Sequence, residues 1–255
     1  MQWRTRRKLT YTLIALLPLL LVAGVVYVAT FFPEPTCFDG EQSGDETGID
    51  CGGSCALVCQ AQTSAASVVW DRAFQVGGDV YSLAAYIENP NTDLVAEDVS
   101  YIFRLYDKDN IFITERRGST TLLPQATNIV FIGGVDTNGR VPSRAVFSYE
   151  ESPFWQQAEI TGVDFAITNR SLTTGNNPRL SFAITNRNNQ PFFNVELTGI
   201  VFTAGGEAVH ISQTLIDRLD VEESTNVVFT WRESFSAADG PYRTEIIPTA
   251  YQIER

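Results

Sequence analysis

Two stretches of sequence decide the fold: SLAAYIENPN at residues 82–91 and RLSFAITNRN at residues 179–188. They match at an offset of 97 residues, and in both the apolar residues alternate with others until the run ends in an Asn-x-Asn turn signal. Alternation with a period of two predicts a β-strand with one buried face. A second pair, TNIVF at 127–131 and TNVVF at 225–229, matches at an offset of 98. We therefore expect two tandem copies of one fold, with a one-residue drift in a loop.

The same period continues around these stretches. Val99, Tyr101 and Phe103 alternate with other residues, and turn residues such as Asp107–Asn110 and Asn176–Pro178 separate the short runs. No helical period persists beyond the apolar segment at residues 9–32. The sequence predicts a mostly β chain with two tandem immunoglobulin-like antiparallel β-sandwiches after one N-terminal transmembrane helix. The cysteine pair that joins the sheets of antibody domains is absent.

The N-terminal end carries a basic cluster and then an uncharged apolar run, LTYTLIALLPLLLVAGVVYVATFF, at residues 9–32. At ~1.5 Å per residue this run spans roughly 36 Å as a helix, enough to cross a hydrocarbon core of ~30 Å. The positive-inside rule then places the N-terminus in the cytoplasm and the rest outside. A cleaved signal peptide and a buried core helix are the alternatives. The expected membrane-anchoring basic residues are Arg4, Arg6, Arg7 and Lys8.

Charge and composition narrow the function classes. The chain has 18 Lys and Arg against 30 Asp and Glu, a net charge of −12, so a nucleic-acid partner is not expected. Its one histidine, His210, excludes multi-histidine metal centres and would have to serve any nucleophilic triad. We expect His210 on a strand surface without a catalytic role. No phosphate-binding or dinucleotide fingerprint is present, and pairs of carboxylates remain the enzymatic alternative.

All four cysteines lie in one short acidic segment: Cys37, Cys51, Cys55 and Cys59. An even number in an extracytoplasmic segment predicts two disulfides, with a four-thiolate zinc site as the alternative. Four cysteines allow three pairings, and the spacing does not choose among them. The glycine-rich segment around them has few apolar residues, so the disulfides are expected to give it shape.

Two short motifs resemble known families. The run CFDGEQSGDETGIDCGGSCALVC at 37–59 resembles a small cysteine motif of bacterial surface proteins, which implies an exported setting and no activity. The pentapeptide FRLYD at 103–107 resembles the signature of the FxLYD domain. That resemblance implies an extracytoplasmic β-sandwich without catalytic residues. In the second copy the matching stretch is GIVFT at 199–203, so its assignment to this family depends on the internal repeat.

The acidic segment also has the spacing of a calcium loop. Oxygen-bearing side chains occupy positions 1, 3, 5, 7, 9 and 12 of an EF-hand-like loop, with Gly44 at position 6. Glu46 stands where an apolar residue is usual, the last position is an aspartate, and cysteines flank the loop in place of helices. The alternative is a solvated acidic linker. The candidate ligands are Asp39, Glu41, Ser43, Asp45, Thr47 and Asp50.

These observations predict a basic tail at 1–8, a transmembrane helix at 9–32, a disulfide-rich acidic neck at 33–62, and sandwiches at 63–156 and 157–255. The expected function is that of a non-enzymatic, single-pass plasma-membrane protein that binds or scaffolds in the cell envelope. The alternative is an accessory subunit of an envelope secretion, transport or sensory complex. Expected partners are the lipid bilayer and an envelope protein or polysaccharide. No cofactor is expected apart from the calcium of the neck.

Overall fold

The computed structural model describes residues 11, 14, 16–24, 26–27, 36–160, 163–236, 240–250 and 253–254. It is mostly β, with several antiparallel sheets, which confirms the predicted class. The described residues between 11 and 27 are helical, and no described helix is long and apolar enough to cross a membrane. The basic residues Arg4, Arg6, Arg7 and Lys8 lie outside the described residues. The chain divides into two compact units, 1–55 and 56–255.

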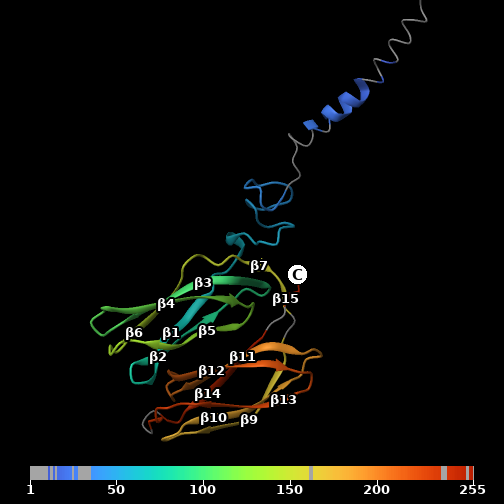
Figure 1. Ribbon diagram of the computed structural model, residues 1–255. Helices are drawn as coiled ribbons and strands as arrows, with labels where there is room; N and C mark the ends of the chain where they lie inside the picture. Colours follow the sequence, from blue (N-terminus) through green and yellow to red (C-terminus); the bar gives the residue numbers. More distant parts are fainter. Residues whose placement is uncertain are drawn as a thin grey trace, which may run out of the picture. The chain divides into compact units, whose positions relative to one another are not determined.

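In the first half of the larger unit, six main strands form two antiparallel sheets that pack face to face (Figure 1), and the short strand β7 (Gln156–Gln157) adds a fourth member to one of them. The strand orders are β1-β2-β5 and β4-β3-β6. Alternate residues of these strands point inward to one core that includes Leu83, Ile87, Phe103, Leu105 and Phe147. The strand bounds are β1 (Ser67–Gly77), β2 (Val80–Glu88), β3 (Leu94–Tyr106), β4 (Phe112–Leu122), β5 (Thr127–Asp136) and β6 (Arg144–Tyr149).

The second half repeats this arrangement strand for strand. Its sheets have the orders β13-β10-β9 and β12-β11-β14, and its core includes Leu180, Phe182, Ile184, Leu197 and Phe229. The bounds are β9 (Phe165–Thr173), β10 (Arg179–Asn186), β11 (Phe192–Phe202), β12 (Ala208–Leu219), β13 (Ser224–Thr230) and β14 (Arg243–Thr249). Short elements complete the unit: η1 (Gln60–Gln62), β7 (Gln156–Gln157), which pairs with β3, and β8 (Glu159–Ile160), which pairs with β15 (Ile253–Glu254).

The two Asn-x-Asn motifs form the same hydrogen-bonded clamp in both halves. Asn89 Nδ2 donates to the carbonyls of Leu94 and Leu123, at 2.9 and 3.0 Å, and its Oδ1 accepts from Asn91. The side-chain amide of Asn91 makes two hydrogen bonds to the backbone of Ser64: its Oδ1 accepts from the Ser64 N–H, and its Nδ2 donates to the Ser64 carbonyl. In the second half Asn186 donates to the carbonyls of Gln190 and Leu219 and accepts from Asn188, and Asn188 bonds the backbone of Asp164. The shared clamp explains why the sequences match there.

The offset of 98 residues that the sequence match of TNIVF with TNVVF indicates is one residue too long. Ile87 of β2 pairs with Asn128 of β5, and its counterpart Ile184 of β10 pairs with Thr225 of β13, which is an offset of 97. A slip of one residue turns every side chain of a strand to the other face. Phe131 accordingly packs with the apolar cluster between the halves, whereas Phe229 lies in the core of its own half.

A third apolar cluster joins the two halves. The outer face of β1-β2-β5 contributes Phe74 and Ala84, and the outer face of β11-β12 contributes Ile200, Phe202 and Ile211. Ile200 is fully buried there. Arg72 of β1 also forms an ion pair with Glu207 at the start of the β12 hairpin. The faces that a lone sandwich would turn to water therefore cover each other.

The smaller unit has almost no apolar core. Between residues 36 and 55, Cys55 is the one buried residue. A disulfide joins Cys37 and Cys55, and Cys51 and Cys59 are disulfide-bonded too, so the described chain has no free cysteine. The prediction of two disulfides is confirmed over the zinc alternative. Beyond this unit, Val58 packs against the core of the first half, and its N–H donates to the carbonyl of Trp155.

Candidate functional site

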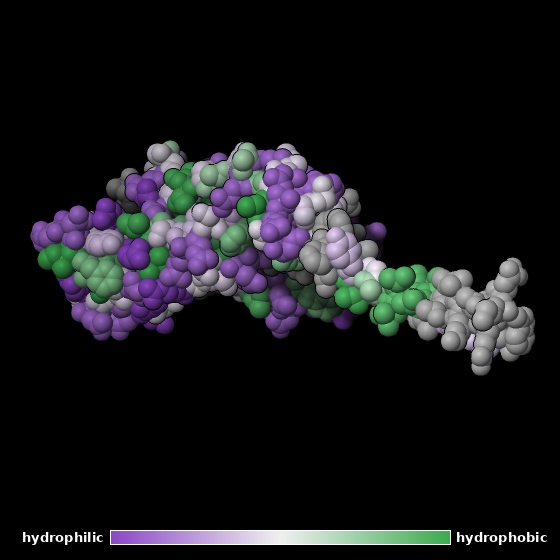
Figure 2. Space-filling view, turned by 90° about the horizontal axis from the view of Figure 1, so that it is seen from above, coloured by the Kyte–Doolittle hydropathy of each residue, from purple (hydrophilic) through white to green (hydrophobic). Residues whose placement is uncertain are grey.

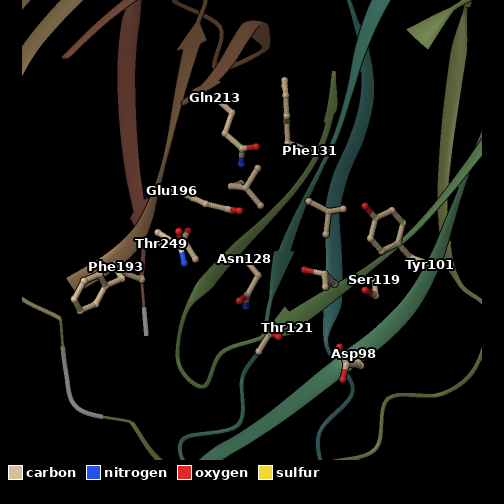
Figure 3. Close-up of a pocket in the computed structure, with 15 residues that line it drawn as sticks. Asp98, Tyr101, Ser119, Thr121, Asn128, Phe131, Phe193, Glu196, Gln213 and Thr249 are labelled. Carbon is tan, nitrogen blue, oxygen red and sulfur yellow. The ribbon is translucent and has the colours of Figure 1, made fainter. Parts of the chain in front are cut away.

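A cleft of about 550 Å³ opens where the first half meets the second (Figure 3). One wall comes from β3, β4 and β5, and the other from β11, β12 and the end of β14. Neither half forms the cleft alone. It is lined by Asp98, Tyr101, Ser119, Thr120, Thr121, Asn128, Ile129, Val130, Phe131, Phe193, Asn194, Glu196, Gln213, Thr249 and Ala250.

Ten of these fifteen residues are polar or acidic, and none of the fifteen is basic. The carboxylates of Asp98 and Glu196 come from opposite halves, and Glu196 points toward the middle of the cleft in Figure 3. Burial raises the pKa of the Tyr101 hydroxyl, and the negative charge of Glu196 raises it further. The cleft is therefore an electronegative site at neutral pH, with a phenol that stays protonated.

Local backbone geometry positions the two walls. Asp98 and Asn194 occupy corresponding places in β3 and β11, and both have a left-handed φ of 51°. In β3 the pairing with β4 shifts between Ala96 and Val99, which makes a bulge beside Asp98. Bulges re-aim side chains and are common next to binding sites. The next residue that faces the cleft from β11, Glu196, pairs with Thr249 of β14, which also lines it.

Some lining groups already have partners. Asn128 Oδ1 accepts from the Leu123 N–H at 2.8 Å, and its Nδ2 donates to the carbonyls of Leu123 and Ala126. Gln213 Nε2 donates to Thr198 Oγ1 at 3.2 Å. The Tyr101 ring lies over Gly118 of the neighbouring strand, where a Cβ would stand 2.5 Å from the hydroxyl. Gly118 therefore makes room for the ring.

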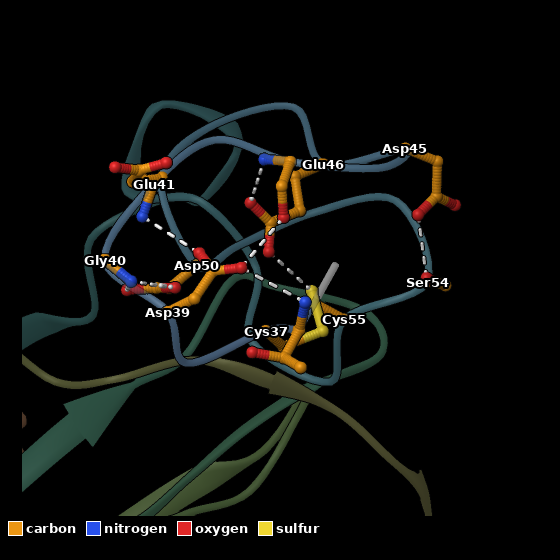
Figure 4. Close-up of a disulfide and its surroundings, with 11 residues drawn as sticks. Cys37, Asp39, Gly40, Glu41, Asp45, Glu46, Asp50, Ser54 and Cys55 are labelled. Carbon is orange, nitrogen blue, oxygen red and sulfur yellow. Dashed lines mark hydrogen bonds between the residues drawn. A yellow bond between two sulfur atoms is a disulfide. The ribbon is translucent and has the colours of Figure 1, made fainter. Parts of the chain in front are cut away.

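The predicted calcium ligands are divided between two sides of the acidic loop (Figure 4). Asp39 and Asp50 lie close together, where Asp39 accepts from the N–H of Glu41 and from Ser43, and Asp50 accepts from the N–H of Gly40. Asp45 points away to Ser54 Oγ, at 2.8 Å.

The hydrogen bonds from the N–H groups of Glu41 and Thr36 hold the pKa of Asp39 below its ordinary value. Among the described residues, one group of three potential ligands has its atoms within 4.8 Å, and it comprises Glu46 with the disulfide cysteines Cys37 and Cys55. A disulfide sulfur carries no thiolate to bind a metal. Of the predicted set, the structure brings Asp39, Ser43 and Asp50 to one side and leaves Asp45 on the other, and calcium binding stays a prediction.

His210 lies on β12, in an aromatic group. Its ring stacks on Phe235 with centroids 4.1 Å apart and planes 12° apart, and Trp231 packs against both rings. A parallel stack of this kind is a packing role. It agrees with the strand position that the sequence predicted, although the side chain is half-buried rather than on the surface.

No family model matches the sequence, and no curated protein matches it. Solved structures with some similarity include three enzymes, each with a TM-score of 0.23. The red sea bream transglutaminase is 10% identical over 74% of this chain and 29% of its own. The β-glucuronidase 2 of Bacteroides uniformis is 13% identical over 70% and 26%, and the exo-chitosanase of Amycolatopsis orientalis is 10% identical over 72% and 26%. This chain thus spans less than a third of each, and likeness at this level carries no argument.

Sequence reasoning assigned none of the cleft residues to a binding site, although it placed Tyr101 and the stretch 127–131 in strands. The cleft residues are separated by more than 150 positions, from Asp98 to Ala250, and only packing between the halves brings them together. One signal was present in the sequence: β11 carries apolar residues on both faces, including Ile200 and Phe202, where β3 carries Arg104. A strand that is apolar on both faces is buried on both.

Proposed function

We propose that this chain is a non-enzymatic, membrane-anchored protein of the cell envelope that binds a ligand or scaffold partner in the cleft between two immunoglobulin-like sandwiches of FxLYD type. The observation that carries the proposal is the cleft itself, a polar site that exists only because two repeated halves share an apolar interface. Ligand sites commonly form at such interfaces between domains.

Several features support the sandwich family. The two halves share one strand order in both sheets. In the FRLYD motif, Phe103 and Leu105 are fully buried in the core of the sandwich. Asp107 opens the turn, where its Oδ1 accepts from the N–H groups of Asp109 and Ile111.

Two features support a location outside the membrane with an N-terminal anchor. The described apolar side chains of the N-terminal helix are all exposed, and that stretch is hydrophobic in Figure 2, unlike the mainly hydrophilic strand-rich surface. Apolar surface of this kind favours a lipid environment. The cysteines are disulfide-bonded, which is typical of oxidising compartments. The proposed order is an N-terminal anchor in the plasma membrane, the acidic neck, and then the two sandwiches outside.

One observation favours an accessory subunit of an envelope complex as the second candidate. Ile111, Phe112 and Val141 are 54%, 46% and 72% exposed. Arg140 donates to the carbonyl of Phe112 at 2.9 Å, so the loops that carry these residues lie together. Clustered exposed apolar residues are typical of protein–protein contacts.

Photo-crosslinking in intact cells tests both candidates. A photoreactive residue would replace Phe193 at the cleft, Phe112 at the apolar tip, or Val228, an exposed β13 residue outside both, as the control. Capture from position 193 alone supports the binding function, and capture of one protein from position 112 alone supports the subunit. If no position captures more protein or glycan than position 228, or if protease added outside the membrane leaves the sandwiches intact, the proposal fails.

A further inference from the structure

We propose that the cleft binds a glycan whose sugars carry no acidic group, an inference that depends on the binding function proposed above. The first argument is charge. Asp98 and Glu196 face the cleft from opposite halves, and none of the fifteen lining residues is basic. An anionic ligand would meet two like charges without a compensating cation, and the repulsion between like charges at short range disfavours its binding. Uncharged and amine-bearing sugars avoid that repulsion.

The second argument is the kind of polar group. The walls offer the hydroxyls of Ser119, Thr120 and Thr249 and the amides of Asn194 and Gln213. Each hydroxyl both donates and accepts a hydrogen bond, which matches a ligand that is itself rich in hydroxyls. A carboxylate that accepts from a sugar hydroxyl makes a stronger, charge-assisted bond. Glu196, which points into the cleft, is placed for that contact.

The third argument is the aromatic rim. Phe193 is 54% exposed and lines the cleft. One side of its ring is covered by the guanidinium of Arg218, 5.5 Å from the ring centroid, and that cation is already paired with Asp220. An exposed ring beside hydrogen-bonding groups offers an apolar face to the C–H surface of a sugar. The volume of about 550 Å³ lies within the ~300–1,000 Å³ typical of small-ligand sites.

A peptide is the competing occupant. It would add to an open strand edge and place alternate side chains in apolar pockets. β4 is such an edge, but its cleft-lining residues are Ser119, Thr120 and Thr121. Side-chain hydroxyls in place of apolar pockets favour the glycan.

The test is calorimetric titration of the full chain in detergent micelles with three hexasaccharides: cellohexaose as the neutral probe, a glucosamine hexamer as the cationic probe, and hexagalacturonate as the acidic probe. We expect saturable binding of at least one of the first two and none of the third. Glu196→Gln should weaken binding about tenfold or more, as expected for one charge-assisted hydrogen bond. Glu222→Gln, an exposed acid of the β12–β13 turn outside the cleft, is its matched control. Phe193→Ala should also weaken binding, with Val228→Ala, at an exposed position of β13, as its control.

Three results would overturn the inference. The first is the absence of heat from all three probes at about 10 mM, a concentration well above the ~1 mM dissociation constant of a weak ligand. The second is tight binding of hexagalacturonate. The third is glycan binding that neither Glu196→Gln nor Phe193→Ala weakens. Cellular crosslinking from position 193 separates the two proposals. A captured protein without any glycan binding retires the glycan and keeps the binding function, whereas neither capture nor glycan binding retires both.

Discussion

At the scale of single residues, the buried asparagines contribute more to the free energy of unfolding than exposed asparagines of nearby loops do. Asn186 is fully buried and donates to two backbone carbonyls. Its replacement by alanine leaves those carbonyls and the Asn188 N–H without a partner, at about 1–3 kcal/mol for each buried group that stays unsatisfied. We expect Asn186→Ala to lower the free energy of unfolding by about 3 kcal/mol in urea titrations. Asn177→Ala, in an exposed loop, should change it by less than about 0.5 kcal/mol. Equal shifts in the two variants would contradict the clamp.

Asp107 shows a second residue effect, which depends on pH. The Ile111 N–H, the Arg140 guanidinium and the Asp109 N–H hold the pKa of Asp107 below its ordinary value of about 3.9. A carboxyl with a lowered folded pKa contributes stability above its unfolded pKa, and that stability is lost as pH falls through the folded pKa. We therefore expect unfolding free energy to fall below about pH 4, and to fall less steeply in Asp107→Asn. Urea titrations between pH 5 and 2 measure this slope, with Asp217→Asn as a control that should keep it.

At the scale of strands and loops, close packing between facing sheets fixes which residues are allowed. A Cβ at Gly199 of β11 would lie 2.6 Å from two ring atoms of Phe229 on β13. Gly199→Ala should therefore cost about 1–3 kcal/mol of unfolding free energy through overpacking. Gly205→Ala, in the β11–β12 turn with its nearest atom at 3.7 Å, should cost much less. Thermal melts of both variants decide the matter, and an unshifted melt for Gly199→Ala would mean that the ring moves freely.

The acidic neck behaves differently because it lacks a packed interior. The Cys37–Cys55 disulfide closes a loop of 18 residues, which is worth about 3 kcal/mol in the chain-entropy model. We expect reduction to abolish hydrogen-exchange protection between residues 36 and 55 and to leave the protection of β2 and β10 intact. Loss of protection in those strands as well would show that the sandwiches depend on the disulfides.

Strands and turns could be predicted from the sequence because a period of two and Asn-rich turns are local signals. The register of β5 could not. TNIVF and TNVVF look alike, yet Val130 and Val227 are the corresponding inward residues, and they sit at an offset of 97 rather than 98. The alignment by identical residues was therefore misleading, because a shift of one residue reverses which side chains of a strand face the core. The arrangement of the candidate calcium ligands in the neck could not be predicted either, because the spacing of residues in a loop does not determine where the side chain of Asp45 points.

At the scale of the whole molecule, the apolar interface decides whether the cleft exists. Ile200 is fully buried between the halves rather than inside one of them. Ile200→Asp would place an uncompensated charge there, so we expect the halves to separate while their own cores stay folded. Small-angle scattering should show a larger radius of gyration. Val228→Asp, at a position 52% exposed on β13, should leave the scattering unchanged. An unchanged profile for Ile200→Asp would contradict the role of the interface.

The cleft could not be predicted because it arises from contacts distant in sequence. Local periodicity reports which face of a strand is apolar, but it does not say which other face will cover it. The same limit applies to the ion pair of Arg72 with Glu207, 135 residues apart. Composition did predict one property of the site, since the excess of acids over bases is repeated among its lining residues.

The shared interface also has a consequence for biosynthesis. The ribosome completes the first half at Tyr149, but Phe202 of the covering face emerges only 53 residues later. At ~5–20 residues per second that interval is roughly 3–10 s. Throughout it the side chains of Phe74 and Phe131 lack the covering face of the second half, so the nascent chain exposes an apolar surface. Such a protein requires another molecule to cover that apolar surface until the second half has been synthesised.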